Sequence, residues 1–113
     1  MDALTAKFSA LADPTRRAIL ARLALGETTL SELARPFDMT VPAVAKHLVV
    51  LERAGLVMKG NRGAARPIRI QVDAFSEMTD WIETCRHHWE GSFDRLAAYL
   101  ETQAEEGPDD AKP

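Results

Sequence analysis

The sequence predicts a mainly α-helical domain with one small two-stranded β-sheet. Apolar residues recur every three or four positions through most of the chain, which is the helical period. Two short runs, residues 56–58 and 68–72, instead have the composition of strands, and the loop between them contains glycine and arginine. At 113 residues the chain is long enough for one domain with a modest core.

The first two helices are predicted from apolar spacing and from the residues at their ends. Leu4, Phe8 and Leu11 form an apolar stripe on the first helix. Asp13, followed by a proline, has the form of an N-cap, and Gly26 is typical of a helix C-terminus. We therefore expect a helix near the N-terminus and a second one between Asp13 and Gly26.

Two further helices are predicted on either side of a short turn. Residues 29–32, Thr-Leu-Ser-Glu, have the form of a capping box, so a very short helix should run to about Pro36. Residues 37–39 form the turn. The next helix has Thr40 as its N-cap, a proline in its first turn and Gly55 at its end.

The helix that follows Thr40 has a buried face and an exposed face. Val44, Leu48 and Leu51 recur at spacings of four and three, which places them on the buried face. Small residues at its start let the backbone approach base edges in a DNA groove, and Lys46 can reach phosphates or guanine acceptors. An ordinary amphipathic helix would have the same buried face, but the order of elements favours a helix-turn-helix followed by a wing. The sequence therefore predicts a winged helix-turn-helix that binds double-stranded DNA.

The residues predicted to contact DNA lie on this helix, on the wing and at the start of the second helix. They are Thr40, Val41, Pro42, Ala43, Lys46 and His47, then Lys59, Arg62 and Arg66, then Arg16 and Arg17. Packing or capping is the alternative role for His47. Pairing with local carboxylates is the alternative for Arg16 and Arg17, and solubility alone is the alternative for the loop arginines.

Charge is distributed unevenly along the chain, whose formal net charge is -3. Residues 1–39 have five basic and five acidic side chains, residues 40–70 have six and one, and residues 71–113 have three and eleven. A positive block confined to the predicted helix and wing is what a DNA duplex requires. The acidic end must face away from the phosphates.

The last long segment, residues 73 to about 102, is predicted to form one helix with an apolar stripe along its length. The stripe is wider than a small winged helix can cover, so we expect it to form a homodimer interface with the first helix. The predicted interface residues are Leu4, Phe8, Leu11, Trp81, Ile82, Trp89, Phe93, Leu96 and Leu100. Burial in the core of a single chain is an equally supported alternative for either Trp81 or Trp89. Residues 1–102 are expected to form the domain, and residues 103–113 an acidic, disordered tail.

Four segments resemble the ArsR family of bacterial transcriptional regulators. They are residues 12–20 (ADPTRRAIL), 31–33 (SEL), Pro42 with 46–48 (KHL), and 51–57 (LERAGLV). The resemblance covers roughly residues 4 to 100. It implies a homodimer that binds an operator, usually represses, and releases DNA when an inducer arrives. A two-fold dimer in turn predicts an imperfect palindrome as operator.

The resemblance also shows which metal ligands the chain lacks. Metal-sensing members have cysteines in the short helix before the turn, and the corresponding residues here are Thr29, Ser31 and Ala34. Hydroxyl and methyl groups are poor ligands for soft metals. A second family site on the last helix would need ligands at Ala74 and Ser76, which do not suit it. Glu83, His87, Glu90 and Asp94 share one helix face, where a solvated polar surface is the main alternative to a weak metal site. We expect no metal and no cofactor.

Other functional classes find less support. Cys85 is the single cysteine, so an intrachain disulfide is excluded, and its place on the apolar stripe favours an inert thiol over a redox sensor. His87 and His88 have no nucleophile nearby in the sequence, so we do not expect an enzyme. No apolar N-terminal run is present, which predicts a cytoplasmic protein without membrane contact.

Two alternatives and one question remain open. The winged helix can serve as a protein-interaction module, with the apolar stripe and acidic tail as its surface. Residues of the last helix, including Cys85, His87 and His88, can instead sense metal or redox state. A small-molecule inducer is expected as a partner, and a pocket at the dimer interface near Trp81, Trp89 and Tyr99 is one place for a small apolar molecule.

Overall fold

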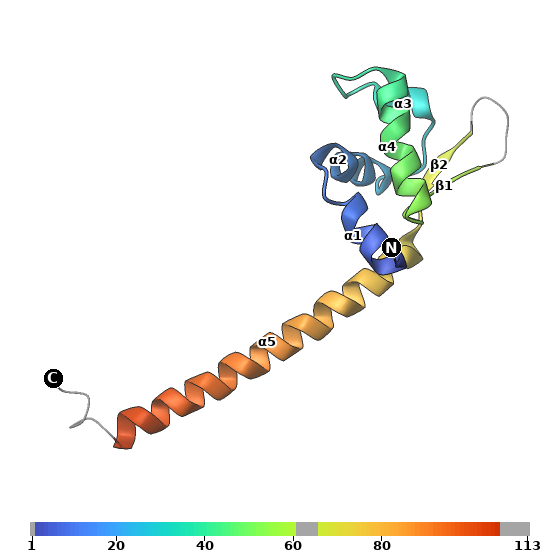
Figure 1. Cartoon of the computed structure of the whole chain (residues 1–113). Helices are drawn as coiled ribbons and strands as arrows, with labels where there is room; N and C mark the ends of the chain where they lie inside the picture. The colour runs from blue at the N-terminus through green and yellow to red at the C-terminus, as the bar shows by residue number, and fades with distance from the viewer. Residues whose placement is uncertain (1, 61–65, 107–113) are drawn as a thin grey trace. The chain divides into compact units, whose positions relative to one another are not determined.

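The computed structural model describes residues 2–60 and 66–106. Within them the chain forms five helices and a two-stranded antiparallel sheet, in agreement with the predicted fold class (Figure 1). The elements are α1 (Ala3–Ala10), α2 (Pro14–Leu23), α3 (Leu30–Ala34), α4 (Val41–Arg53), β1 (Val57–Lys59), β2 (Ile68–Ile70) and α5 (Val72–Glu106). None of the described helices is long and apolar enough to cross a membrane.

Contacts divide the chain into two compact units, residues 1–78 and 79–113. The first unit contains α1 to α4, the sheet and the start of α5, and the second contains the rest of α5. Helix α5 continues four residues beyond the predicted end near Thr102, so it includes the first part of the predicted tail. Residues 107–113 of that tail lie outside the described residues.

Side chains cap the helices of the first unit where the sequence predicts caps. Asp13 accepts a hydrogen bond from the main-chain N–H of Arg16 (3.1 Å). Thr29 accepts one from Glu32 N (3.4 Å), and Thr40 accepts one from Ala43 N (3.2 Å). These bonds satisfy N–H groups that have no partner within the helix.

Two glycines end helices as predicted. Gly26 and Gly55 follow α2 and α4 with φ of 144° and 82°, conformations that glycine adopts without a steric penalty. Helix α3 is shorter than predicted, because it ends at Ala34 and not near Pro36. Of the predicted capping box, the bond from Glu32 N to Thr29 forms, whereas the Glu32 carboxylate pairs with Arg35 (3.1 Å).

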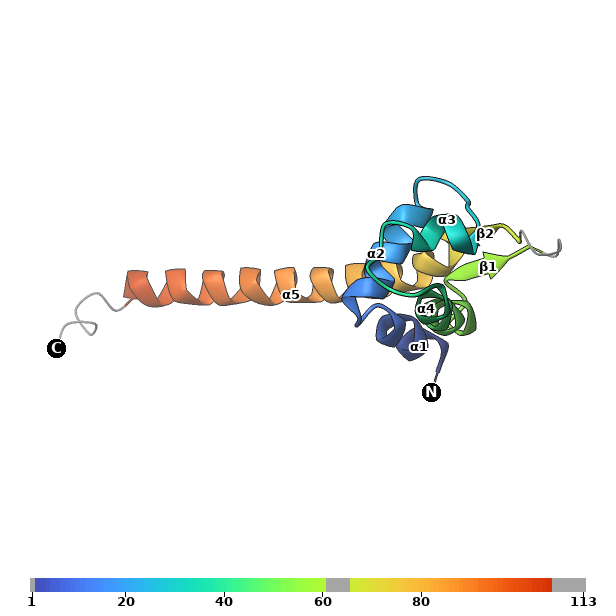
Figure 2. The same cartoon turned by 90° about the horizontal axis from the view of Figure 1, so that it is seen from above.

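The core of the first unit lies around α4. Helices α1, α2 and α3 and strand β1 all contact α4, and α2 also contacts β2 (Figure 2). Val44, Leu48 and Leu51 are fully buried, which confirms the predicted buried face of α4. The full set of buried apolar residues is Ala10, Ile19, Leu20, Leu23, Leu33, Ala34, Val44, Leu48, Leu51, Leu56, Val57, Ile68 and Met78. Helix α4, whose exposed face is predicted to contact DNA, is thus the central element of the core.

The two strands pair in the register Val57↔Ile70, Met58↔Arg69 and Lys59↔Ile68. The predicted bounds of the first strand were wrong by one residue, because the N–H of Leu56 bonds to Leu51 O (2.9 Å) at the end of α4. The strand therefore begins at Val57 and includes Lys59.

The second strand is shorter than the predicted 68–72. It ends at Ile70, which pairs with Val57, the first residue of β1. Beyond that pair Gln71 N donates to Leu56 O (2.8 Å), and Ala74 N donates to Gln71 O (3.1 Å), so the backbone turns into a helix. Val72 is therefore the first residue of α5, despite its preference for strands.

Candidate nucleic-acid interface

The N-terminal turn of α4 is a solvent-exposed surface made of small side chains. Thr40, Pro42 and Lys46 are exposed, Ala43 is half-buried, and the side chain of Val41 is 43% exposed although it is apolar. Val44 follows Ala43, is fully buried, and anchors the turn to the core. Small side chains allow a DNA groove to approach the helix closely. Lys46 has the longest side chain on this surface that can donate a hydrogen bond.

His47 lies in the contact between α4 and α2. Its Nδ1 is 3.8 Å from Asp13 Oδ2 and 3.5 Å from Arg16 Nη1, and the side chain is 22% exposed. The hydrogen bond from Arg16 N lowers the pKa of Asp13, and the nearby His47 and Arg16 charges act in the same direction. This geometry fits the packing and capping alternative for His47.

Arg16 and Arg17 bond to the carbonyl groups at the end of α1. Arg16 Nε donates to Ala10 O (2.6 Å) and Nη2 to Ser9 O (3.3 Å), and Arg17 Nη1 donates to Leu11 O (2.7 Å). The last carbonyls of a helix lack partners within it and carry partial negative charge, so cations are favoured there. From the sequence we expected these two arginines to contact phosphate or local carboxylates, and their bonds to the helix carbonyls were not predicted.

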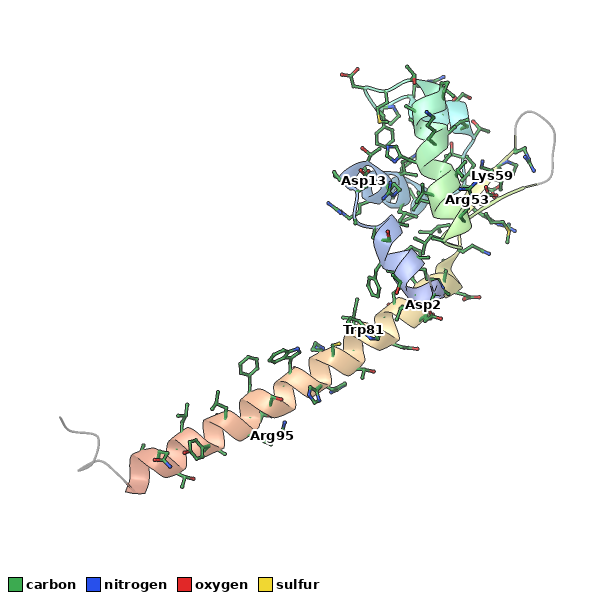
Figure 3. All side chains as sticks on the ribbon, viewed as in Figure 1. Asp2, Asp13, Arg53, Lys59, Trp81 and Arg95 are labelled. Carbon is green, nitrogen blue, oxygen red and sulfur yellow. The ribbon has the colours of Figure 1, made fainter. Side chains whose placement is uncertain are left out.

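The wing is closed at its base by one main-chain hydrogen bond and one hydrogen bond from a side chain. Gly60 N donates to Pro67 O (2.8 Å), and Arg66 Nε donates to Gly60 O (2.9 Å). A Cβ at Gly60 would lie 2.8 Å from Pro67 Cγ, so this close approach requires glycine. Lys59 is the last residue of β1 (Figure 3), and its Nζ lies 3.7 Å from Glu52 Oε1 on α4. Arg62, also predicted to contact DNA, lies outside the described residues.

Arg69 is a wing cation that the predicted contacts did not include. It is exposed on β2 between the buried Ile68 and the half-buried Ile70. The alternation of residues 68–70 was the signal that could have revealed it, because successive strand residues face opposite sides. The described wing thus presents Lys59, Arg66 and Arg69 as its cations.

In the second unit, α5 carries large apolar side chains that are about half exposed (Figure 3). They are Trp81 (51%), Ile82 (48%), Trp89 (61%), Phe93 (62%), Leu96 (51%), Tyr99 (60%) and Leu100 (56%). The rings of Trp89 and Phe93 are 5.9 Å apart. The other predicted interface residues, Leu4, Phe8 and Leu11, are half-buried and pack against the core of the first unit.

The polar residues of α5 form short-range pairs. Glu83 accepts a hydrogen bond from Arg86 (2.9 Å), which raises the pKa of Arg86, and lies 4.0 Å from His87 Nε2. The Cys85 thiol is free and half-buried. Over residues 2–60 and 66–106 no group of three or more histidine, cysteine, aspartate or glutamate residues is placed to hold a metal ion.

The exposed turn of α4, the basic wing and the arrangement of the three preceding helices define a winged helix-turn-helix DNA-binding protein. Residues 11–59 match the helix-turn-helix domain family. The chain is 42% identical to an ArsR family transcriptional regulator of known crystal structure, RHA00566, with a TM-score of 0.73 over 78% of this chain and 91% of that chain. The protein belongs to the ArsR family of transcriptional regulators.

Other relatives extend this comparison. The chain is 49% identical to the HTH-type transcriptional regulator Rv2034 of Mycobacterium tuberculosis, over 52% of this chain and 55% of that protein. The match therefore spans about half of that relative's length. It is 40% identical to the HTH-type transcriptional regulator YuzN of Bacillus subtilis, over 67% of this chain and 91% of YuzN.

Two further comparisons concern assembly and function. The chain is 28% identical to the transcriptional repressor SdpR of Bacillus subtilis, over 66% of this chain and 83% of SdpR. It is 26% identical to a homodimeric winged helix-turn-helix DNA-binding domain from Mycobacterium bovis, with a TM-score of 0.62 over 80% of this chain and 84% of that chain.

Proposed function

We propose that this regulator is a homodimeric repressor that binds an imperfect palindromic operator and is released by a non-metal inducer. The observation that carries the proposal is the exposed N-terminal turn of α4 beside a basic wing. Residues 40–70 have six basic side chains and one acidic one, whereas residues 71–113 have three and eleven. Because the net positive charge is confined to residues 40–70, it attracts a DNA duplex to that part of the chain alone.

In the proposed complex, α4 enters the major groove and the wing contacts the flanking backbone. Thr40, Val41, Pro42 and Ala43 offer few bidentate hydrogen-bonding groups, so Lys46 is the main candidate for a polar base contact. DNA shape and deformability should then contribute much of the sequence preference. Lys59, Arg62 and Arg66 supply phosphate contacts, whereas Arg16, Arg17 and His47 hold α1, α2 and α4 in place.

Dimerisation is supported by the apolar surface of α5. Trp89 and Phe93 are more than 60% exposed, and exposed apolar stripes of this extent usually mark an interface. The Mycobacterium bovis domain to which the chain is similar is homodimeric. A two-fold pair of α4 helices would read two half-sites about one helical turn apart.

Repression is supported by the similarity to SdpR, a transcriptional repressor. A non-metal inducer is supported by the residues at the thiolate positions of the metal-sensing relatives, Thr29, Ser31 and Ala34, none of which binds soft metals.

Fluorescence anisotropy tests DNA binding most directly. Labelled DNA from upstream of the protein's own gene is compared with a shuffled duplex over a salt series. We expect tight binding to the upstream DNA, weaker binding to the shuffled duplex, and a loss of affinity as salt increases. Failure to bind either duplex at low salt would overturn the proposal and favour a protein-interaction module. Equal binding to both would place the operator elsewhere in the genome and would require a genome-wide selection of binding sites.

A further inference from the structure

A small cavity lies where the wing meets the helix-turn-helix. It has a volume of about 120 Å³ and is lined by Leu30, Leu48, Lys59, Arg66 and Ile68. Leu48 and Ile68 are at most 2% exposed, so they form an apolar floor. The side chain of Lys59 is 24% exposed and Arg66 is exposed, which places the two cations at the rim. An apolar floor beneath two positive charges is the combination that an amphiphilic anion requires.

Both cations can accept a new anionic partner at little cost. Arg66 uses Nε for Gly60 O, and no other hydrogen bond of its guanidinium is found within the described residues. Lys59 Nζ is 3.7 Å from Glu52 Oε1, and the Glu52 side chain is 43% exposed. The pair is long and its carboxylate is exposed to solvent, so it contributes little free energy and a ligand carboxylate can replace Glu52 as the partner of Lys59.

The volume limits the apolar part of the ligand. An apolar cavity of roughly 150 Å³ accommodates one benzene molecule, so a cavity of about 120 Å³ open to solvent suits one ring or a short branched chain. We propose that this cavity binds a small monocarboxylate with a compact apolar body, and that its binding weakens the binding of DNA. This inference rests on the proposed function, since it names the chemical class of the inducer.

The coupling to DNA follows from the shared cations. Lys59 and Arg66 are also proposed phosphate contacts, and a guanidinium that holds a carboxylate bidentately cannot hold a phosphate in the same way. A bound carboxylate also cancels positive charge on the wing. Since Leu48 belongs to α4, the ligand touches both DNA-contacting elements at once.

Benzoate is the probe for ligand binding, with benzyl alcohol as a neutral probe of similar size. Both are titrated into the 15N-labelled protein without DNA, and amide shifts are followed by NMR. We expect benzoate to shift the amides of the described lining residues with roughly millimolar affinity, and benzyl alcohol to bind about tenfold more weakly. Equal binding of the two probes, or benzoate shifts confined to α5, would overturn the proposal.

Two variants locate the site. Leu30→Phe fills the cavity and should abolish the benzoate shifts, whereas Leu25→Phe, at a leucine that is 84% exposed, should leave them unchanged. Lys59→Met keeps the apolar stem and removes the charge, so it should weaken benzoate binding about tenfold even if Leu30→Phe does not fold. Unchanged benzoate affinity in folded Lys59→Met would contradict the site.

The effect on DNA is measured separately at constant ionic strength, with benzoate replacing chloride. We expect saturating benzoate to weaken wild-type DNA binding about tenfold and to leave DNA binding by Leu30→Phe unchanged. DNA binding that does not respond to bound benzoate would overturn the inference alone. Absence of DNA binding without benzoate would overturn the proposed function, whatever the NMR titration shows.

Discussion

Replacing Arg66 by alanine should reduce the salt dependence of DNA binding by a calculable amount. The guanidinium uses Nε to close the wing on Gly60 O, and its terminal nitrogens have no hydrogen-bond partner among the described residues, so they can bind a phosphate. Each phosphate contact contributes about 0.9 to the slope of log K against log salt, and a dimer has two copies, so the slope should fall by about 1.8. Between about 50 and 200 mM salt, the variant should then lose roughly twelvefold less affinity than the wild type.

Anisotropy titrations at four or more salt concentrations measure this slope. Arg86→Ala is the matched control, because it removes the same charge from α5, where Arg86 pairs with Glu83 (2.9 Å). We expect the control to retain the wild-type slope. Circular dichroism should show that Arg66→Ala keeps its fold, since within the described part of the chain the substitution removes a single exposed hydrogen bond. A folded Arg66→Ala protein with an unchanged slope would exclude Arg66 from the interface and refute the reasoning.

Three other substitutions test assembly and stability. Trp89→Ala, which removes a side chain that is 61% exposed, should weaken the dimer by roughly 3 kcal/mol per copy; sedimentation equilibrium would contradict this if dissociation were unchanged. Asp13→Asn should destabilise the protein at about pH 5 and much less at about pH 2.5 in urea unfolding. The Arg16 N–H lowers the pKa of Asp13 from its ordinary 3.8, so the carboxylate stabilises the fold above that value and ceases to do so as pH falls through the lowered pKa. A difference that grows on acidification would be inconsistent with this. Gly60→Ala should lower the unfolding free energy by about 1 kcal/mol or more, because its Cβ would lie 2.8 Å from a proline carbon; an unchanged thermal midpoint would argue against it.

The helix ends were predictable because they depend on residues within four positions of one another. Asp13, Thr29 and Thr40 each accept an N–H three residues ahead, so the pattern is visible in the sequence. The buried face of α4 was predictable for a similar reason, since a period of three to four residues specifies which side faces the core. The same period placed Lys46 on the exposed side, where the structure has it.

Contacts between distant residues could not be predicted in this way. Arg16 bonds to Ala10 O and approaches His47, which is 31 positions away. No local sequence pattern predicts either partner. Thr28 pairs with Ile68 across the loop before α3, although the sequence predicted only two strands. Local composition also failed at Val72, because the register with β1 ends the strand before the β-branched residue is reached.

The connections between α4 and the wing explain why one small site can influence both. Leu56, just after α4, accepts a hydrogen bond from Gln71 N (2.8 Å), and Lys59 on β1 pairs with Glu52 on α4. Ile68 bonds at both N and O to Thr28, so the wing is also joined to the chain before α3. Displacing the Lys59–Glu52 pair with a carboxylate therefore alters a charged contact between the wing and α4. A ligand held there needs no signal through the dimer interface, and this distinguishes it from an inducer bound beside Trp81 and Trp89.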